Sequence, residues 1–428
     1  MSTGSGAAAT VKTTTKNGAR MKINSYENRL TLILFLCFGF VFFDRLALSF
    51  LFPFVAEDLN LNNSHLGMLS SVLALAWALS GMTLGHIADK KDSKKYILVI
   101  SVIAFTLCSA LSGMVTTFIS LLIFRGLMGV AEGPVLPIAQ SLIADASTPK
   151  RRGLNMGLVN ASAPGLIGAI IAPPVLIWLA TDYGWRTAFY ATMIPGLIIA
   201  ALIMMFVRNK HRHDSIASEH HHVSKGDIKS LLKNRNIVLC VLISCFYISW
   251  FITLISFTPT FLMQARGFTP ETMGGIMGSL GFAWMIWGFV ISALSDRFGR
   301  KPMMILFTLI ATACPMVLLY ADADSMLPLV FLTYTGLGCF TLFMATIPAE
   351  TVSPGQVATA LGLIMGVGEL FGGFVTPTVA GFMADVYGLE IVMWIASAGS
   401  AVAVVLSLFL QETAPAKVGH QQEMAVSA

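Results

Sequence analysis

The sequence predicts an all-α membrane protein with twelve transmembrane helices, arranged in two six-helix bundles that are related by pseudo-two-fold symmetry. Of its 428 residues, 56% are hydrophobic and only 11% are charged, and the mean hydropathy is +0.77. Soluble domains contain about 25% charged residues, so the composition excludes a soluble protein. Apolar segments of about 20 residues, the length needed to cross a bilayer, recur along nearly the whole chain.

The apolar segments fall into two groups of six. The first group occupies 31–55, 66–88, 96–117, 118–143, 154–180 and 188–207. The second group occupies 237–262, 272–294, 302–320, 327–350, 357–384 and 389–411. We therefore expect a disordered tail over 1–29, an N-terminal bundle over 30–207, a polar linker over 208–236, a C-terminal bundle over 237–411 and a second tail over 412–428.

The distribution of basic residues predicts the orientation of the chain. With the N-terminus inside, 23 of the 27 lysines and arginines fall on the inner side of the membrane. Only Arg186 and Arg266 fall outside, and Arg45 and Arg125 lie within spans. Because inner loops are enriched in Lys and Arg, we expect both termini to be cytoplasmic in a multi-pass protein of the cell (inner) membrane.

The two halves of the chain repeat one another. Residues 144–149 (ADASTP) match 349–354 (AETVSP) at an offset of 205, and at the same offset Gly157 matches Gly362. The loops that follow the second and eighth spans also match, with Asp89 opposite Asp296. A repeat of this length indicates a duplicated bundle, because solenoid repeats are far shorter.

These loops carry a family resemblance. Residues 85–95 (GHIADKKDSKK) and 292–301 (SALSDRFGRK) resemble the paired signature loops of the major facilitator superfamily. The first copy departs from the pattern at Asp92, and the second departs at Ser292, where glycine is usual in each case. The resemblance implies two halves that rock about a midplane site to give alternating access.

Ionisable residues inside the spans mark the predicted site, since a charge in a membrane is costly and usually functional. At about 1.5 Å per residue, Asp44, Glu132 and Glu369 lie roughly 17–20 Å from the inner side, near the centre of the bilayer. Arg45 adjoins Asp44, and Arg125 lies two turns from Glu132 on nearly the same helix face. We expect the four charges of spans one and four to meet in a water-filled site as two acid–base pairs, or else to form a structural salt-bridge tie.

Such pairs suit proton coupling. Burial disfavours an ionised carboxylate and a nearby arginine favours it, so a carboxylate held between the two influences binds and releases protons near neutral pH. A substrate anion competes with the acid for the bidentate fork of arginine. Protonating the acid would free the arginine for the substrate.

The local sequence resembles the anion:cation symporter family. Residues 125–137 (RGLMGVAEGPVLP) resemble its fourth helix, and 43–45 (FDR) resemble its first-helix motif, with Phe43 where tyrosine is common. The resemblance implies that Asp44 and Glu132 are protonated, that Arg45 binds the acid group of the substrate, and that Arg125 supports Glu132. Spinster-type lipid transporters share a similar charge set.

Three further residues are candidate substrate contacts. Glu369 has no acidic counterpart, since Pro164 stands at the matching position, and it is either a cavity group or a packed, hydrogen-bonded acid. Asn160 lies beside a bend-favouring Ala-Pro-Gly stretch, with helix–helix hydrogen bonding as the alternative. Tyr247 of the seventh span is a candidate cavity residue or a packed aromatic.

Charged residues at the inner ends of the spans are the predicted gates. Asp145 and Glu350 end spans four and ten at matching repeat positions, beside the two basic signature loops. Salt bridges there would hold the outward-open state, although ordinary interface charges are the alternative. The predicted gating set is Asp89, Asp145, Asp296, Arg297, Arg300 and Glu350.

The sequence thus predicts a proton-coupled symporter of a small organic anion, such as a sugar acid, an aromatic acid or another carboxylate. The alternatives are a Spinster-like exporter of lipids or drugs, and a membrane receptor built on a transporter scaffold. No nucleophile–base or metal set is evident, so we expect no enzyme activity, cofactor or metal, and no nucleic-acid partner. The expected partners are the anion, protons and membrane lipids, and the chain is expected to be a monomer.

Overall fold

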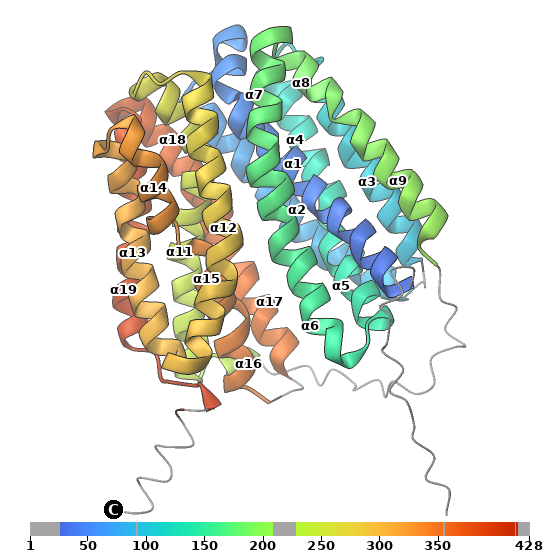
Figure 1. Cartoon of the computed structure of the whole chain (residues 1–428), viewed down its shortest axis with the longest axis vertical. Coiled ribbons are helices and arrows are strands. Elements are labelled where there is room, and N and C mark those ends of the chain that lie inside the picture. Colours follow the sequence, from blue (N-terminus) through green and yellow to red (C-terminus); the bar gives the residue numbers. More distant parts are fainter. Residues whose placement is uncertain (1–25, 91–92, 209–227, 354–355, 416, 418–428) are drawn as a thin grey trace, which may run out of the picture.

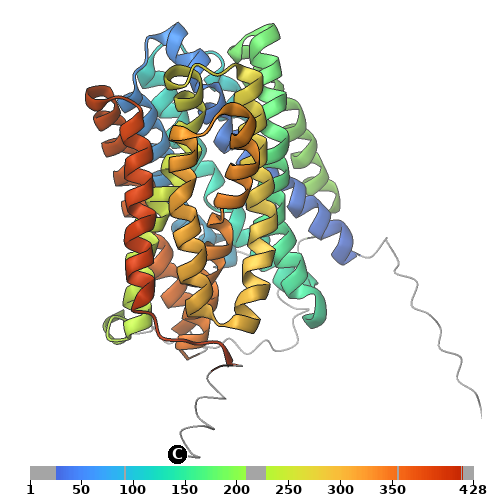
Figure 2. The same ribbon diagram turned by 60° about the vertical axis from the view of Figure 1, so that its left-hand side comes forward.

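The computed structural model describes residues 26–90, 93–208, 228–353, 356–415 and 417, apart from the side chains of 82, 85–90, 149, 150 and 358. Over the part that it describes, twelve helical segments are long and apolar enough to cross a membrane. They run along the long axis of the molecule in both side views (Figures 1 and 2). The predicted fold class is confirmed.

The N-terminal bundle contains six spans, some of which are interrupted helices. They are α1 (Tyr26–Leu59), α2 (Asn63–Lys90), α3 (Lys94–Ser112), α4 with α5 (Phe118–Glu132, Val135–Ala146), α6 with η1, η2 and α7 (Pro149–Gly157, Leu158–Ser162, Pro164–Ile171, Ala172–Tyr183), and α8 with α9 (Trp185–Ala191, Met193–Phe206). A short helix, α10 (Ile228–Leu231), lies within the segment predicted as a linker.

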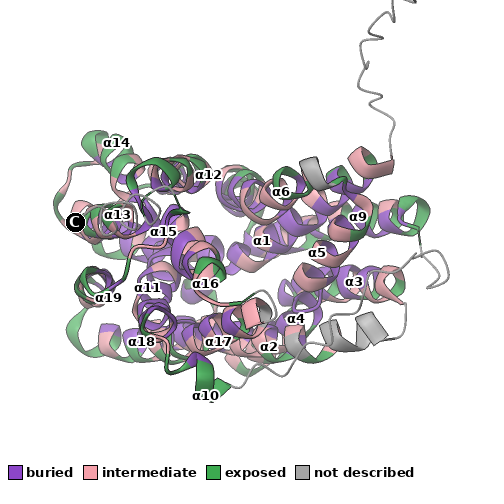
Figure 3. Cartoon of the chain, turned by 90° about the horizontal axis from the view of Figure 1, so that it is seen from below, coloured by how far each residue is buried: buried purple, intermediate pink, exposed green. Residues whose placement is uncertain are grey.

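The C-terminal bundle repeats this plan. Its spans are α11 with η4 (Arg235–Thr260, Phe261–Ala265), α12 (Pro270–Phe298), α13 (Arg300–Tyr320), α14 with α15, η5 and α16 (Ala323–Thr333, Gly336–Thr341, Leu342–Thr346, Ile347–Thr351), α17 with η7 and α18 (Val357–Gly368, Glu369–Val375, Thr376–Tyr387), and α19 (Glu390–Leu408). The two bundles stand side by side when the molecule is viewed from below (Figure 3).

The described ends of the chain, at α1 and beyond α19, lie at the same end of the molecule (Figure 1). We call this the inner end and the opposite one the outer end, after the predicted orientation. Large apolar side chains are exposed on the perimeter, including Ile100, Ile194 and Val386. In Figure 3 exposed residues occupy the rim and buried residues the interior of the bundles. A rim of apolar side chains is what hydrocarbon solvent requires.

Several spans leave the regular α-helical form near their middle. The fourth span breaks at Gly133 and Pro134, where proline cannot donate to the hydrogen-bond ladder. The fifth and eleventh spans contain π-helical turns that begin at Pro164 and Glu369, positions that match in the repeat. Single π turns often mark functional sites, and both of these border the space between the bundles.

The halves contact each other in the outer part of the molecule. The carboxylate of Asp385 accepts hydrogen bonds from the backbone N–H groups of Asn63 and Ser64, at 2.8 and 3.0 Å. Nearer the middle, Ser71 donates to the carbonyl of Phe374 at 2.6 Å and accepts from Thr378 at 2.8 Å. These bonds join α2 to the eleventh span and close the outer end.

Candidate functional site

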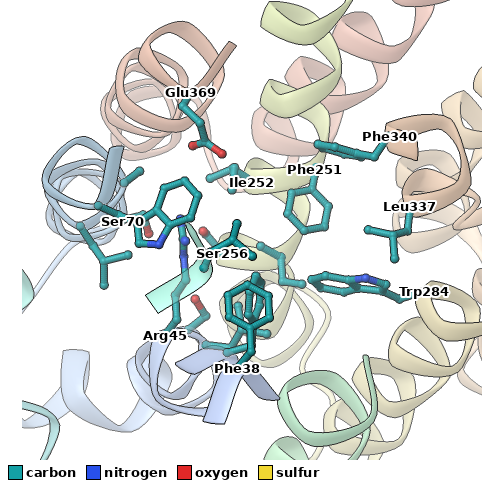
Figure 4. Close-up of a pocket in the computed structure, with 18 of the residues that line it drawn as sticks. Phe38, Arg45, Ser70, Phe251, Ile252, Ser256, Trp284, Leu337, Phe340 and Glu369 are labelled. Carbon is teal, nitrogen blue, oxygen red and sulfur yellow. The ribbon is translucent and has the colours of Figure 1, made fainter. Parts of the chain in front are cut away.

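A cavity of about 240 Å³ lies between the two bundles, at the middle of the spans. Side chains from both halves line it, and most of them are apolar (Figure 4). The N-terminal bundle contributes α1, α2, α4, α5 and η1, and the C-terminal bundle contributes α11, α12, α15, η5, α17 and η7. The polar lining residues are Arg45, Ser49, Ser70, Arg125, Gln140, Asn160, Ser256 and Glu369.

Arg45 reaches this cavity from α1 between two aromatic rings. Its guanidinium carbon lies 5.1 Å from the ring centroid of Trp77 and 5.9 Å from that of Phe42. Within the described part of the chain, no carboxylate lies within ion-pair distance of it. Cation–π attraction to the two rings holds the guanidinium at the cavity wall, where its fork of donors can meet an anion.

Arg125 lies deeper, with 2% of its surface exposed, although it contributes to the lining. One terminal nitrogen donates to the backbone carbonyl of Arg45 at 3.2 Å. Its Nε and Nη2 atoms have no hydrogen-bond partner in the described protein. Arg125 therefore anchors the backbone under Arg45 and keeps unused donors of its own.

Asp44 points away from the cavity, into the interior of the N-terminal bundle. It is fully buried, and its Oδ1 atom accepts a hydrogen bond from the hydroxyl of Ser109 in α3 at 3.0 Å. The hydroxyl of Thr192, at the start of α9, lies 3.1 Å from that of Ser109. Among the described residues, the second carboxylate oxygen of Asp44 has no hydrogen-bond partner.

Glu132 is also fully buried, at the last residue of α4 just before the break in the fourth span. Neither of its carboxylate oxygens has a hydrogen-bond partner in the described protein. The charges of Arg45 and Arg125 both act on it electrostatically. An acid placed in this way is near two cations but is bound to neither.

The predicted acid–base pairs are therefore not formed in this structure. Asp44, Arg45, Arg125 and Glu132 are gathered in one region, but no ion pair within 4.0 Å joins any two of them. One physical reason is helix geometry, since consecutive residues point about 100° apart at 3.6 residues per turn. Asp44 and Arg45 accordingly face different sides of α1, and only the arginine enters the cavity.

Glu369 and Asn160 line the cavity from the π-helical parts of the eleventh and fifth spans. The carboxylate of Glu369 faces the cavity in Figure 4, and its Oε2 atom has no hydrogen-bond partner. The Oδ1 atom of Asn160 is likewise without one. Each side chain thus brings an unused acceptor to the wall of the cavity.

Tyr247 does not lie on this wall, and its predicted placement in the cavity lining is corrected. Its side chain is fully buried and stacks on Trp250, with ring centroids 5.0 Å apart. Phe340 and Phe343 pack against it at 5.7 Å each. The residue faces the core of its own bundle, one helical turn behind Phe251, which does line the cavity.

Two lining residues, Trp77 and Gln140, were not anticipated from the sequence. Trp77 forms the aromatic face under Arg45, and Gln140 faces the cavity from α5. The available signal for Gln140 was its polar side chain within the fourth span. Nothing in the sequence distinguishes Trp77 from an aromatic residue that packs in the core or lies at the membrane interface.

At the inner end, predicted gating residues form ion pairs in both halves. Arg300 bonds Glu350 at 2.8 Å and Asp296 at 2.5 Å. In the other half, Asp145, which matches Glu350 in the repeat, bonds Lys94 at 3.3 Å. Arg297 is exposed and lies over the ring of Phe298 at 5.5 Å, whereas the side chain of Asp89 is outside the described part. Each of these ion pairs lies within one bundle.

Within the described residues, no group of three His, Cys, Asp or Glu side chains is arranged to hold a metal ion. The histidines at 211, 213 and 220–222 lie outside the described residues.

The sequence matches the family model described as Major Facilitator Superfamily over residues 34–370 and 288–426, which together span most of the chain. The chain belongs to the major facilitator superfamily. It is therefore a multi-pass membrane transporter and not an enzyme, as predicted.

Two curated relatives in this superfamily carry organic acids. The hexuronate transporter of Bacillus subtilis is 27% identical over 308 residues, which are 67% of this chain and 70% of that protein. The cis,cis-muconate transport protein of Acinetobacter baylyi is 25% identical over 380 residues, which are 86% of this chain and 91% of that protein. The recognised similarity to anion:cation symporters is confirmed by such relatives.

Among solved structures, a bacterial homologue of the human lysosomal transporter Spinster is similar with a TM-score of 0.74. It is described as inward-facing and occupied, and it is 18% identical over 90% of this chain and 96% of that one. At this identity the similarity shows the superfamily fold alone.

Proposed function

We propose that the protein is a proton-coupled symporter of a small organic anion and works by alternating access of the cavity between its two halves. The observation that carries this proposal is the cation of Arg45, which faces the cavity without an acidic partner among the described residues. Beside it, Asp44 and Glu132 are buried with three carboxylate oxygens unbound. An anion site and protonatable sites are thus adjacent but separate.

Charge balance gives the coupling its physical basis. When ionised, Asp44, Glu132, Arg45 and Arg125 sum to zero, and the carboxylate of Glu369 on the cavity wall adds one negative charge. Binding one monoanion at Arg45 adds a further negative charge in a region where uncompensated charge is costly. One proton taken up by Glu132 or Asp44 offsets the charge of the bound anion. Two forms of the transporter then switch between the inward-open and outward-open states. They are the empty protein and the protein that has bound both the proton and the anion.

The direction of transport follows from the proposed orientation. Lysine and arginine counts favour cytoplasmic termini in the cell (inner) membrane, so an inward proton gradient drives import.

The inner-end ion pairs of Arg300 with Glu350 and Lys94 with Asp145 are the proposed gate elements. The outer-end bonds of Asp385 must break when the outer side opens. We propose that the transporter acts as a monomer.

Relatives that are named as hexuronate and muconate transporters support a carboxylate substrate. A lipid or drug exporter of the same fold is less well supported. The cavity of about 240 Å³ is smaller than the ~300–1,000 Å³ of pockets for drug-sized ligands, so it suits a small solute better than an acyl chain.

Purified protein in liposomes provides the test. A panel of sugar acids, aromatic acids and dicarboxylates is first screened for thermal stabilisation, and the best ligand is then used as a radiolabelled substrate. We expect an inward proton gradient to drive accumulation of the substrate, with acidification of the lumen. Uptake should rise as the outside is made more acidic.

The variant Glu132→Gln separates coupling from binding. It should abolish gradient-driven accumulation but retain exchange of labelled for unlabelled substrate, because a neutral amide mimics the protonated acid. Glu57→Gln, at an exposed acid near the outer end of α1, is the matched control and should behave as the wild type. If substrate accumulation by the wild-type protein did not depend on the pH gradient, that result would falsify proton coupling.

A further inference from the structure

The cavity has two chemically different sides. Arg45, Ser256 and Glu369 lie toward one side of the close-up, and Phe251 and Trp284 lie toward the other (Figure 4). All five residues line the cavity. A ligand that fills the space therefore meets Arg45, flanked by the rings of Phe42 and Trp77, with Ser256 and Glu369 on one side, and the rings of Phe251 and Trp284 on the other.

The aromatic side is a continuous series of edge-to-face contacts that joins the two bundles. Phe42 contacts Trp284 with ring centroids 5.7 Å apart and planes at 88°. Phe251 contacts Trp284 at 5.1 Å and 82°, and Phe340 at 5.1 Å and 68°. All four rings line the cavity. Another planar ring can extend this series, since edge-to-face and offset pairs are the favoured aromatic geometries.

A polyhydroxylated body would fit this side poorly. Each sugar hydroxyl that leaves water for a wall of phenyl rings loses its hydrogen bonds without replacement, and unmade bonds cost binding free energy. An aromatic or conjugated body carries few such groups, and burying it is favourable. The aromatic side therefore discriminates between carboxylates by the polarity of the body that follows the acid group.

Glu369 discriminates between monocarboxylate and dicarboxylate substrates by their charge. Its carboxylate faces the same cavity as Arg45, with Oε2 unbound, and the two groups interact electrostatically. One substrate carboxylate finds a cation at Arg45. A second carboxylate on the same substrate would meet Glu369 or the aromatic rings, and like charges in a poorly solvated space repel strongly.

We propose that the substrate is a small monocarboxylate with a planar aromatic or conjugated body, and that Glu369 and the aromatic series exclude dicarboxylates and sugar acids. This inference rests on the proposed function, because it assumes that Arg45 binds the acid group. It assigns the body of the substrate to Phe42, Trp284, Phe251 and Phe340, and it assigns charge selection to Glu369.

The first experiment tests the body of the substrate by competition binding to the purified full-length protein. Benzoate, cyclohexanecarboxylate and glucuronate each carry one carboxylate. We expect benzoate to bind about tenfold or more tightly than glucuronate, and more tightly than cyclohexanecarboxylate. Phe251→Leu should reduce the preference for benzoate over cyclohexanecarboxylate several-fold. Phe289→Leu, the same change at a ring on the exposed face of α12, should leave the preference intact.

The second experiment tests charge selection with two ligands of nearly the same shape. Terephthalate carries a second carboxylate where 4-nitrobenzoate carries an uncharged nitro group. We expect 4-nitrobenzoate to bind at least tenfold more tightly, and Glu369→Gln to close most of that gap by strengthening terephthalate binding. Glu57→Gln should leave the gap unchanged. The ratio of two affinities within one variant is insensitive to a partial loss of folded protein.

The outcomes separate the inference from the function on which it rests. Glucuronate or a dicarboxylate binding more tightly than every aromatic monoacid would overturn the inference while leaving anion symport intact. The inference would also be overturned if Glu369→Gln left the difference in affinity between 4-nitrobenzoate and terephthalate unchanged. By contrast, binding of none of these acids, or binding that Arg45→Gln leaves unchanged, would overturn the proposed function itself.

Discussion

Asp44 and Arg45 are neighbours in the chain, but their side chains lie in different parts of the protein. The carboxylate of Asp44 is buried against Ser109 in α3, whereas the guanidinium of Arg45 lies over Trp77 at the wall of the cavity. The turn of the helix between two consecutive residues thus separates the proposed protonatable group from the proposed anion-binding group by one backbone step. This separation allows the occupancy of one to influence the other through charge without direct competition for a hydrogen bond.

The role proposed for Arg45 can be tested by two substitutions of different severity. Arg45→Gln should weaken substrate binding about 10- to 150-fold, since a charge-assisted hydrogen bond contributes about 1.5–3 kcal/mol. Arg45→Lys keeps the charge but loses the planar fork and the stacking on Trp77, so we expect a loss of about tenfold. Equilibrium binding of the identified substrate measures both.

Arg29→Gln is the control for this series, because Arg29 is an exposed arginine whose guanidinium carbon lies 6.0 Å from the ring centroid of Phe206, far from the cavity. It should bind substrate normally. Equal affinities for Arg45→Lys and the wild type would show that the fork and the stack are not needed.

Among single residues, polar side chains within the spans were the more useful signal. Arg45, Arg125, Asn160 and Glu369 all line the cavity, whereas Asp44 points into the N-terminal bundle. Aromatic side chains were a poor signal, as with Tyr247, which packs inside its own bundle. A charged residue in a span has few tolerable places, whereas an aromatic residue suits lipid, the helix core and a cavity about equally. Hydrophobic periodicity cannot choose among them when every face of the helix is apolar.

Among the elements, the π-helical turns of the fifth and eleventh spans place Asn160 and Glu369 on the cavity wall. The Ala-Pro-Gly stretch at 163–165 indicated a bend in the fifth span, and one π-helical turn, η2, begins there, whereas the turn that carries Asn160, η1, begins earlier, at Leu158. The matching turn in the eleventh span begins at an acid in a glycine-rich segment, and no proline signalled it. The sequence therefore predicted the spans and their order, but not how these two turns orient their side chains.

Gly373 in η7 provides a test of this element. A Cβ atom added there would lie 2.4 Å from Oε2 of Glu369 and 3.3 Å from Cβ of Ala74. Gly373→Ala should therefore displace the Glu369 carboxylate and alter ligand selection, with little loss of folded protein, because the clash is with the end of a flexible side chain. The ratio of 4-nitrobenzoate to terephthalate affinity measures the effect.

Gly366→Ala, one turn before Glu369 in α17, is the matched control because an added Cβ meets nothing within 4 Å. It should leave ligand selection unchanged. Gly372→Ala is a different case, since its Cβ would lie 2.6 Å from the backbone nitrogen of Ser249. That variant should lower thermal stability. A Gly373→Ala protein with wild-type selection would argue against a role for the Glu369 position.

The two inner-end ion pairs should differ in their contribution to stability. The side chains of Arg300 and Glu350 are 9% and 20% exposed, whereas those of Lys94 and Asp145 are 20% and 51% exposed. Removing one partner of a buried pair costs about 3–5 kcal/mol, and removing one from an exposed pair costs about 0–1 kcal/mol. Arg300→Gln should therefore lower the thermal midpoint of the detergent-solubilised protein by clearly more than Lys94→Gln does. Equal shifts would contradict the structural asymmetry.

For the whole molecule, the sequence repeat predicted two bundles but not where they touch. The described contacts between them depend on glycines that let backbones approach closely. A Cβ at Gly67 would lie 2.2 Å from the carbonyl oxygen of Pro377, and one at Gly381 would lie 2.4 Å from that of Asn63. Small residues at helix contacts are common in membranes. Their partners lie in the opposite half of the sequence, however, and a single sequence does not reveal such pairings.

These contacts predict that Gly67→Ala shifts the protein toward a state that is open on the outer side. The three nearest neighbours of the added Cβ are all backbone atoms, of Pro377 and Thr378, so no side-chain rotation relieves the clash and the outer end cannot close as it does here. A reporter cysteine, Ser256→Cys, lies in the cavity and is labelled with a membrane-impermeant thiol reagent. Without the glycine change, we expect faster labelling in inverted membrane vesicles than in intact cells. With Gly67→Ala, labelling in intact cells should rise several-fold and substrate uptake should fall.

The parent protein without the reporter corrects for its native cysteines. Gly278→Ala, where an added Cβ meets nothing within 4 Å, should keep the original sidedness. If Gly67→Ala also kept it, the close packing of α2 against the eleventh span would not be what holds the outer end shut.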